Sequence, residues 1–287
     1  MAMKSTLQVQ EVLLVSSVII QHFNGKKFDL DKLGYRVQMV SPFGSNWTQA
    51  VTQLNRYVNI VQQPKAQPKT FTLTLAMNCQ DITGLQLKYE ALSMIFNGEY
   101  YFWMYLADIP HIRWEVTVSG EPQYTPQGTT GYGTASITLY CAKGFAETTH
   151  STAEIPTDQG ANNYDLGLFG IGTHFPHSGT NPVYSSSAPH VMQIYNAGTI
   201  ALRAKGLHGK IICYNGDGLS IDNNANGTSF HYHKPYSKLV LDGYSCFADG
   251  KFDFVNSDKG HIDLERGWNQ IITSGPSKVT FDLHFYY

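Results

Sequence analysis

The second half of the chain alternates short apolar segments with turn residues, and this pattern limits the fold more than any other feature. Beyond residue 195, Asn, Asp and Gly recur at short intervals between segments rich in branched and aromatic side chains. In the last segment every second residue is apolar, namely Val279, Phe281, Leu283 and Phe285. Such alternation is typical of a half-buried strand, and short strands joined by Gly-containing turns are typical of a β-sandwich. We therefore predict a self-contained sandwich over residues 190–287.

Shorter strands and tight turns complete this predicted sandwich. The strands are expected at Val191–Tyr195, Thr199–Ala204, Lys210–Tyr214, Leu219–Ile221, Leu239–Leu241 and Asn269–Thr273. The turns are expected at residues 196–198, 215–218, 223–227 and 242–243, where Gly stands beside or near Asn or Asp. Asn-Gly and Asp-Gly favour the left-handed backbone of tight hairpins, so they predict antiparallel pairing of the strands that they join.

Residues 1–147 form another predicted unit, which combines antiparallel strands with one helix. From Thr83 to Phe96 apolar side chains recur at helical spacing, and Asp81 or Thr83 can cap the start. Asn97-Gly98 supplies a residue able to take a left-handed turn at the helix end. Strands are expected at Tyr35–Val40, Tyr57–Gln62, Phe71–Cys79, Tyr100–Leu106, Ile112–Val118 and Thr134–Ala142, with a long loop at Gly120–Gly133. One helix against antiparallel sheet indicates an α+β unit or a β-sandwich with an added helix.

Between these units, residues 148–189 differ in composition. This segment is rich in Ser, Thr, Asn, Gly and Pro and has few branched aliphatic side chains, as expected of a domain linker or an arm. Its apolar island Leu166–Ile171 is unlike a free linker, so we expect part of it to pack on a neighbouring surface. The whole chain is therefore predicted to be mainly β, with two domains joined by this segment.

Charge and hydropathy exclude several classes of function. Charged residues make up 15% of the chain and the net charge is −2, without a block of like charge, so we expect no nucleic-acid contact. The longest apolar stretch, Val12–Ile20, is far shorter than the roughly 20 residues that span a bilayer. We expect no membrane segment and no signal peptide. The four cysteines, Cys79, Cys141, Cys213 and Cys246, lack metal-binding spacing. Cys79 and Cys141 continue apolar strand faces and are expected to be inert core thiols.

Two histidines form the sharpest metal-like feature. His231 and His233 would share one face of a strand, where two imidazoles can bind one ion. The third ligand would have to come from His208, His261 or Asp222, none of which stands at a characteristic spacing. A polar strand face or loop explains the pair more simply, and we expect no metal.

Paired carboxylates are the other candidates for chemistry. Asp263 and Glu265 would share a face of an extended segment, as the two acids of a glycoside hydrolase must face one sugar. Their short polar run ends at Gly267 and is more simply a turn. Asp217 and Asp222 resemble a calcium loop only faintly, because the spacing does not fit an EF-hand. With no nucleophile elbow, phosphate loop or dinucleotide fingerprint, we expect no catalytic residue, no cofactor and no enzyme activity.

Aromatic side chains of the predicted sandwich are the remaining candidates for binding. Exposed aromatic rings can stack on sugar rings or on a partner protein. The alternative is packing in the core or at an interface, which is the more frequent role of such residues. The candidate carbohydrate or partner contacts are Tyr232, Tyr236, Tyr244 and Trp268.

Several segments, taken in order, resemble the distal tail proteins of phages with long non-contractile tails. In the first half they are Phe23-Asn24-Gly25, Leu33-Gly34-Tyr35, the strand and helix that end at Asn97-Gly98, Tyr100–Trp103 and Ala135–Ala142. In the second half they are the Asn-x-Gly-Thr turn in Ile194–Thr199, the Asp-Gly of Leu239–Gly243 and the Leu-x-x-Gly-x-Asn of Leu264–Asn269. No single motif is specific, but their order covers nearly the whole chain.

This resemblance implies a structural protein of the virion tail tip, made in the cytoplasm of the host bacterium. It implies a tail-tube-like domain over residues 1–147, which forms the belt of a hexameric ring, and a galectin-like sandwich over residues 190–287. The implied partners are further copies of the chain, the tail tube protein, the tail-tip protein and receptor-binding proteins. Low charge and abundant aromatic residues agree with large, permanent interfaces. The alternative is a standalone lectin-like protein that binds cell-wall glycans.

Overall fold

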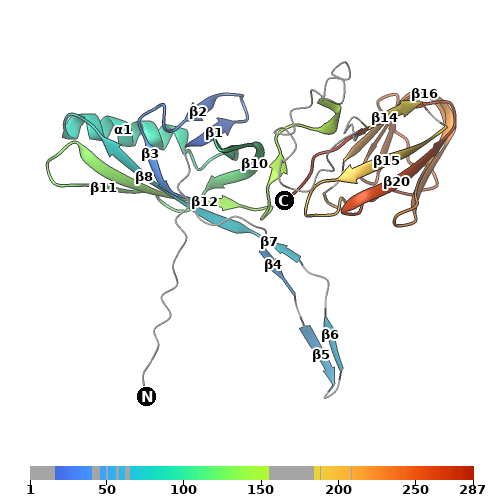
Figure 1. Ribbon diagram of the computed structural model, residues 1–287, viewed down its shortest axis with the longest axis horizontal. Helices are drawn as coiled ribbons and strands as arrows, with labels where there is room; N and C mark the ends of the chain where they lie inside the picture. The colour runs from blue at the N-terminus through green and yellow to red at the C-terminus, as the bar shows by residue number, and fades with distance from the viewer. Residues whose placement is uncertain are drawn as a thin grey trace. The chain divides into compact units, whose positions relative to one another are not determined.

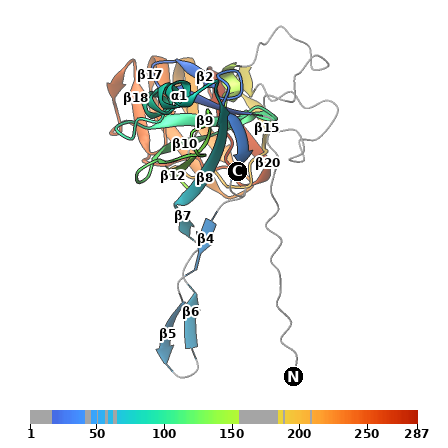
Figure 2. The ribbon, with the colours of Figure 1, turned by 90° about the vertical axis from the view of Figure 1, so that its left-hand side faces the viewer.

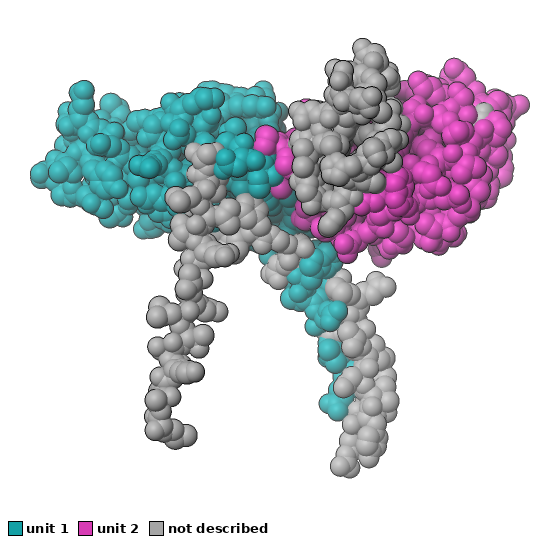
Figure 3. All heavy atoms as spheres, in the orientation of Figure 1, with its two compact units in different colours: residues 1–109, 113–146 teal, residues 110–112, 147–287 magenta. Residues whose placement is uncertain are grey.

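The computed structural model describes residues 17–40, 46–49, 51–55, 58–61, 65–154, 184–187, 189–207 and 209–287. The chain divides into two compact units, which Figure 3 shows in different colours. Unit 1 comprises Met1–Ile109 and Arg113–Ala146, and unit 2 comprises Pro110–Ile112 and Glu147–Tyr287. Most of the predicted linker or arm lies outside the described residues. Among the described residues, no helix is long and apolar enough to cross a membrane.

Unit 1 is built on antiparallel sheet with one helix (Figure 1). Its main strands are β1 (Val18–His22), β2 (Lys27–Asp29), β3 (Arg36–Met39), β8 (Lys69–Asn78), β9 (Phe102–Leu106), β10 (Ile109–Val118), β11 (Gln123–Pro126) and β12 (Tyr132–Cys141). The order of hydrogen-bonded neighbours is β2-β1-β9-β10-β12-β8-β3, with β11 beside β12. The predicted strands at Phe71–Cys79, Tyr100–Leu106, Ile112–Val118 and Thr134–Ala142 are confirmed apart from small shifts at their ends.

Alternation along the strands places one face of each in the core of unit 1. The buried positions of β8 and β12 include Phe71, Leu73, Leu75, Met77, Ala135, Ile137 and Leu139. The ring of Phe71 lies edge-on against that of Trp114 on β10, with 5.7 Å between centroids. The helix of unit 1 packs on this apolar layer.

Helix α1 (Ile82–Ile95) and its predicted N-cap are confirmed. Asp81 Oδ1 accepts a hydrogen bond from Gly84 N at 2.7 Å, which satisfies one of the amides that a helix start leaves unpaired. The hydroxyl of Tyr89 donates to the carbonyl of Thr134 on β12 at 3.4 Å. The face of α1 turned to the sheet contributes the buried side chains Leu85, Leu92 and Ile95. The helix therefore lies on the sheet through its 3.6-residue stripe, and its other face is exposed.

One expectation for unit 1 is wrong. Gly120–Gly133 is not a loop throughout, because Gln123–Pro126 forms β11 and pairs with β12. The prolines and glycines conceal this strand, but a Pro at the end of an outer strand removes no ladder hydrogen bond. The predicted strand at Tyr35–Val40 is confirmed as β3. That at Tyr57–Gln62 lies partly outside the described residues, and its described part forms a strand.

Unit 2 is an antiparallel sheet organised around one long hairpin (Figure 1). Its strands are β14 (Ser185–Ser187), β15 (His190–Asn196), β16 (Lys210–Asn223), β17 (Thr228–Asp242), β18 (Ser245–Ala248), β19 (Lys251–Phe252), β20 (Gly267–Ser274) and β21 (Lys278–Asp282). The unit also contains the short strand β13 (Glu147–Thr148), outside this sheet, and a 3-10 turn at Thr152–Glu154. The first half of β16 pairs with β21, whereas its second half pairs with β20. β14 extends the first layer and β15 the second. The hydroxyl of Tyr184, next to β14, donates to Tyr195 O and accepts from Tyr195 N at 3.1 and 3.0 Å, which joins the two layers.

Residues 215–218 are a β-bulge inside β16 rather than the predicted turn. The register of β16 against β17 shifts between Asp217 and Leu219. Asn215 and Gly218 have positive φ angles of 54° and 77°, a backbone that hairpin turns and bulges both require. The strands predicted on either side of this segment are therefore one strand.

The other predictions for unit 2 divide into confirmed and wrong ones. The turns at 223–227 and 242–243 are confirmed as the β16–β17 and β17–β18 connections. The strand expected at Thr199–Ala204 is wrong, because these residues form only an isolated bridge between Leu202 and Leu264. Their apolar side chains are nevertheless buried, so alternation here reflects packing without a strand ladder.

The described cysteines are free thiols, and the burial of Cys141 agrees with the core role predicted for it. Cys141, Cys213 and Cys246 are buried, and Cys79 is half-buried. Burial raises the pKa of Cys246 to about 11 and also raises that of Cys141. A thiol held protonated in this way is a poor nucleophile.

Candidate assembly and binding surfaces

A narrow two-stranded ribbon belongs to unit 1 and is visible in Figures 1 and 2. We call this ribbon the arm; it is distinct from the linker predicted at residues 148–189. Its strand β5 (Val51–Asn55) pairs with β6 (Val58–Val61), and β4 (Asn46–Thr48) pairs with β7 (Lys65–Gln67). Among the described strands, none of the larger sheet pairs with these four. β7 runs through Pro68 into the core strand β8. Through β7, the arm therefore continues directly from a core strand of unit 1.

The arm exposes apolar side chains. Trp47 is 44% exposed and Val51 is 59% exposed. An isolated two-stranded ribbon is at best marginally stable in water, because it has no buried face. The arm is therefore suited to lie against a further surface that covers one of its faces.

An apolar groove of about 630 Å³ lies beside α1. Leu87 and Met94, which are 61% and 76% exposed, line it from the helix. They are seven residues apart, two helical turns, and so lie on the same side of α1. Phe28 and Leu33 line it from the segment around β2. An exposed apolar wall of this kind is typical of an interaction site.

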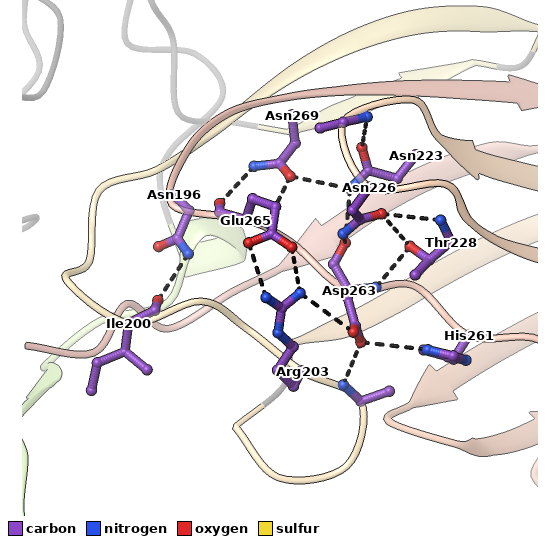
Figure 4. Close-up of polar contacts among 12 residues, drawn as sticks. Asn196, Ile200, Arg203, Asn223, Asn226, Thr228, His261, Asp263, Glu265 and Asn269 are labelled. Carbon is purple, nitrogen blue, oxygen red and sulfur yellow. Dashed lines mark hydrogen bonds and ion pairs between the residues drawn. The ribbon is translucent and has the colours of Figure 1, made fainter. Parts of the chain in front are cut away.

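Buried amides fix the turn before β20 (Figure 4). Asn269 is fully buried, and its Nδ2 donates to the carbonyls of Glu265 and Gly267 at 2.8 and 3.0 Å. Its Oδ1 accepts from Glu265 N at 2.8 Å and from Asn223 Nδ2 at 3.1 Å. The amide thus has all four of its hydrogen-bonding positions filled. The Leu-x-x-Gly-x-Asn motif is a turn held by the side chain of its own last residue.

The Asn-x-Gly-Thr turn is built in the same way. Asn196 Oδ1 accepts from Gly198 N, and its Nδ2 donates to Ile200 O, both at 3.0 Å. Gly198 has no room for a side chain, since a Cβ would lie 2.5 Å from the carbonyl oxygen of Tyr286. Both motifs therefore hold the backbone of unit 2 in place.

Arg203 binds both carboxylates that the sequence offers as an acid pair (Figure 4). Its two terminal nitrogens donate to Glu265 Oε1 and Oε2 at 2.6 and 2.9 Å, and Nη1 lies 3.5 Å from Asp263 Oδ2. Asp263 Oδ1 also accepts from Ala204 N at 2.8 Å. The hydrogen bonds from the Arg203 guanidinium hold the pKa of Glu265 below its usual value. A general acid for glycoside hydrolysis needs the opposite shift, so this pair is an anchor between two loops.

Replacing Glu265 with Gln is expected to lower the free energy of unfolding at pH 7 by less than about 1 kcal/mol, because the ion pair is partly exposed and screened by water. A carboxyl whose pKa is depressed in the folded state stabilises the fold above its unfolded-state pKa, and this contribution is lost as the pH falls through the folded-state pKa. The difference between wild type and Glu265→Gln in urea unfolding should therefore shrink from neutral to acid pH. A difference independent of pH would contradict the ionised pair, and the exposed Glu90→Gln serves as the control.

The structure separates the four aromatic candidates. Tyr232 and Tyr236 are only 2% and 6% exposed, and their hydroxyls form hydrogen bonds within unit 2. The expectation that they present a ring to a ligand is wrong, because the period of β17 turns both towards the core. Tyr244 and Trp268 are each 46% exposed and remain candidate contacts.

The histidine pair is not assembled into a metal site. His231 Nδ1 lies 2.6 Å from Asp258 Oδ2, and its Nε2 lies 3.7 Å from Asp222 Oδ1. His233 is exposed, and His208 lies outside the described residues. Within the part of the chain that the structure describes, no group of three or more His, Cys, Asp or Glu side chains could hold a metal ion.

Sequence reasoning missed the arm and the apolar side of the helix. Ribbon residues such as Val51 have no regular alternation with their neighbours, because all the described side chains of β5, residues 51–53, are exposed. Leu87 and Met94 did carry a signal, since they are apolar yet lie off the stripe that contains Leu85 and Leu92. Apolar side chains away from the core stripe of a helix are the pattern that would have indicated the groove.

The chain is similar to phage tail proteins in one domain and in its fold. Residues 23–141 match the phage tail protein RIFT-related domain. The crystal structure of the SPP1 Dit (gp 19.1) protein, described as a paradigm of the hub adsorption apparatus in phages that infect Gram-positive bacteria, is similar with a TM-score of 0.62 at 10% identity, over 93% of this chain and 99% of that chain. The phage P2 baseplate in its activated conformation gives a TM-score of 0.45 at 12% identity, over 94% and 97%. No curated protein matches the chain in sequence.

The matched domain and the fold shared with SPP1 Dit confirm the resemblance to phage tail proteins that the ordered segments indicate. The matched domain starts just after β1 and ends with β12, so it covers most of the sheet of unit 1. The likeness of fold to SPP1 Dit extends over both units. The mainly β fold predicted from the sequence is confirmed as well.

Proposed function

We propose that this phage tail protein is a subunit of the distal tail hub, in which six copies form a ring between the tail tube and the proteins of the tail tip. The observation that supports this most strongly is the joint occurrence of a phage tail domain in unit 1 and a fold shared with SPP1 Dit over nearly the full length of both chains. In this proposal residues 1–147 form the ring. Residues 190–287 form a galectin-like domain to which receptor-binding proteins attach, and residues 148–189 connect the two.

Two exposed apolar surfaces of unit 1 support the proposed ring. A closed ring joins two different surfaces of neighbouring copies, because the contacts run head to tail. Unit 1 has two separate candidates, the arm with Trp47 and Val51 exposed and the groove with Leu87 and Met94 exposed. Both are apolar surfaces that a neighbouring copy would remove from water. We assign both to contacts between subunits of the ring.

The ring is tested by the size and shape of the purified full chain. Light scattering gives the mass of the particle, and negative-stain images of the same peak show whether it has a sixfold outline with a central channel. A ring supports the proposal. A chain that remains monomeric both alone and when mixed with its tail tube protein would overturn it. Cross-links between this chain and the tail tube and tail-tip proteins in purified virions would identify its axial partners.

The double variant Leu87→Glu, Met94→Glu is expected to shift the ring to monomers, because each subunit contact would bury two carboxylates without partners. The fold should persist, since both side chains are already mostly in water. Native mass spectrometry measures the assembly, and thermal unfolding measures the fold. The matched control is Thr83→Glu, Gln86→Glu, which adds the same charge to exposed positions of α1 outside the groove. Equal assembly of both variants would remove the groove from the interface.

A further inference from the structure

The outer face of β15 and β20 combines exposed aromatic, amide and aliphatic side chains in a regular arrangement. The two strands lie side by side (Figure 1), and their register pairs Tyr195 with Trp268, Gln193 with Gln270 and Val191 with Ile272. Their alternate residues point inward and are buried. We call the six outward residues the outer platform. Along each strand they span about 13 Å, at roughly 3.3 Å per residue.

At one end of the outer platform two aromatic rings meet. The ring of Trp268 lies 5.1 Å from that of Tyr195, edge to face, with an interplanar angle of 62°. Trp268 is 46% exposed, so the edge contact with Tyr195 holds the indole in place while leaving much of it in water. A fixed and partly exposed indole can stack on an apolar face of a ligand without a large loss of side-chain entropy.

The centre of the outer platform is uncharged and rich in hydrogen-bonding groups. Gln270 Oε1 accepts from the Nδ2 of Asn224 at 2.9 Å, which orients the Gln270 amide. Gln193 stands directly opposite on β15 and is exposed, with no side-chain partner among the described residues. An amide offers both donors and acceptors. The pair is therefore able to bind hydroxyl groups, which also both donate and accept.

We propose that the outer platform is a binding site for a neutral oligosaccharide, with Trp268 stacking on one sugar ring and Gln193 and Gln270 binding hydroxyls of the adjoining one. A hexose presents an apolar C–H face and a rim of hydroxyls, and the platform offers one surface for each. Gln193 and Gln270 separate the aromatic end of the platform from its aliphatic end, which is the pair of Val191 and Ile272. A docking core for another protein favours a contiguous apolar surface, so the arrangement favours sugar over protein.

The Asp–His group beside the outer platform does not alter this choice of ligand. Asp222 stands opposite Ile272 on the next strand, β16. Its carboxylate lies near the imidazole of His231, and that imidazole is also bonded to Asp258. These carboxylates would disfavour an anionic polymer near the Ile272 end, whereas a neutral sugar is not repelled.

The experiment measures binding of the full chain to immobilised neutral hexasaccharides of glucose, galactose and N-acetylglucosamine by biolayer interferometry. Wild type is expected to bind at least one of them, and Trp268→Ala is expected to bind it about tenfold more weakly, equal to roughly 1.4 kcal/mol. Tyr101→Ala is the matched control, because Tyr101 is an aromatic residue of similar exposure, 43%, and belongs to unit 1 rather than to the platform. Its affinity should equal that of wild type.

A second variant tests the amide pair separately. Gln193→Leu, Gln270→Leu keeps the aromatic end and removes the hydroxyl-binding groups, so it too should weaken binding. Thermal unfolding of each variant confirms that the fold is kept. The proposal is overturned if wild type binds none of the sugars at millimolar concentration, or if Trp268→Ala binds as wild type does. Sugar binding and ring assembly are measured separately on the same samples. Loss of sugar binding with an intact ring would overturn this proposal alone, whereas sugar binding by a monomer would count against the hub role alone.

Discussion

Asn269→Leu should destabilise unit 2 by on the order of 3 kcal/mol, the largest single effect that we expect from a change without added volume. The variant keeps a side chain of similar size but leaves main-chain groups of Glu265 and Gly267 without their side-chain partner in a dry environment. It also removes one of the two acceptors of Asn223 Nδ2. Urea unfolding followed by intrinsic fluorescence measures the loss. For a domain with a typical stability of about 5–15 kcal/mol this is a large share.

The control for this prediction is Asn224→Leu. Asn224 is exposed and its side chain makes one described hydrogen bond, to Gln270. Its replacement should cost less than about 1 kcal/mol, because water satisfies the group left behind. Equal losses in the two variants would mean that the buried amide does not hold the turn, and the explanation of the motif would then be wrong.

Gly144→Ala is the second large effect, because the new methyl group would overlap the carbonyl oxygen of Gln67. Gly144 also has a φ of 77°, which L residues rarely adopt. Backbone must move to relieve such an overlap, and we expect a loss of about 3 kcal/mol or more in the stability of unit 1. Gln67 ends β7 at the base of the arm. We therefore also expect the displaced arm to reduce ring assembly, measured by native mass spectrometry.

Gly128→Ala separates strain from overlap. Gly128 has a φ of 63°, but a Cβ placed there would meet no atom within 4 Å. Its replacement carries only the backbone penalty, about 1–2 kcal/mol, and should leave assembly unchanged. If Gly144→Ala unfolds at the same denaturant concentration as Gly128→Ala, the close approach at the base of the arm has no energetic weight.

The core elements were predictable because each buries one face within its own unit. Helix α1 and strands β8 and β12 turn a stripe or an alternate set of residues to the sheet interior, and that period is visible in the sequence. The cap at Asp81 was readable for the same local reason, since a helix start needs a side-chain acceptor there. A periodic pattern of apolar residues appears in the sequence where an element buries one face within its own unit.

Prediction failed where two kinds of local structure require the same backbone conformation. Asn215 and Gly218 need positive φ in a bulge just as they would in a hairpin, so residue types alone could not separate the two. Tyr232 and Tyr236 were predicted as ligand contacts because their residue type alone does not show which face of β17 points into the core. Tyr195 was passed over for the same reason, although the register of β15 with β20 sets it beside Trp268.

The hairpin of β16 and β17 has a consequence for how unit 2 resists damage. β16 pairs with β21 in one layer and with β20 in the other, so opening either layer disturbs a strand that the other layer shares. We therefore expect the two layers to unfold together rather than one at a time. Proteases cut chains that open locally. In the proposed tail hub, whose subunits could not be replaced once the particle has left its host, a sandwich that opens only as a whole would offer such enzymes few cleavage sites.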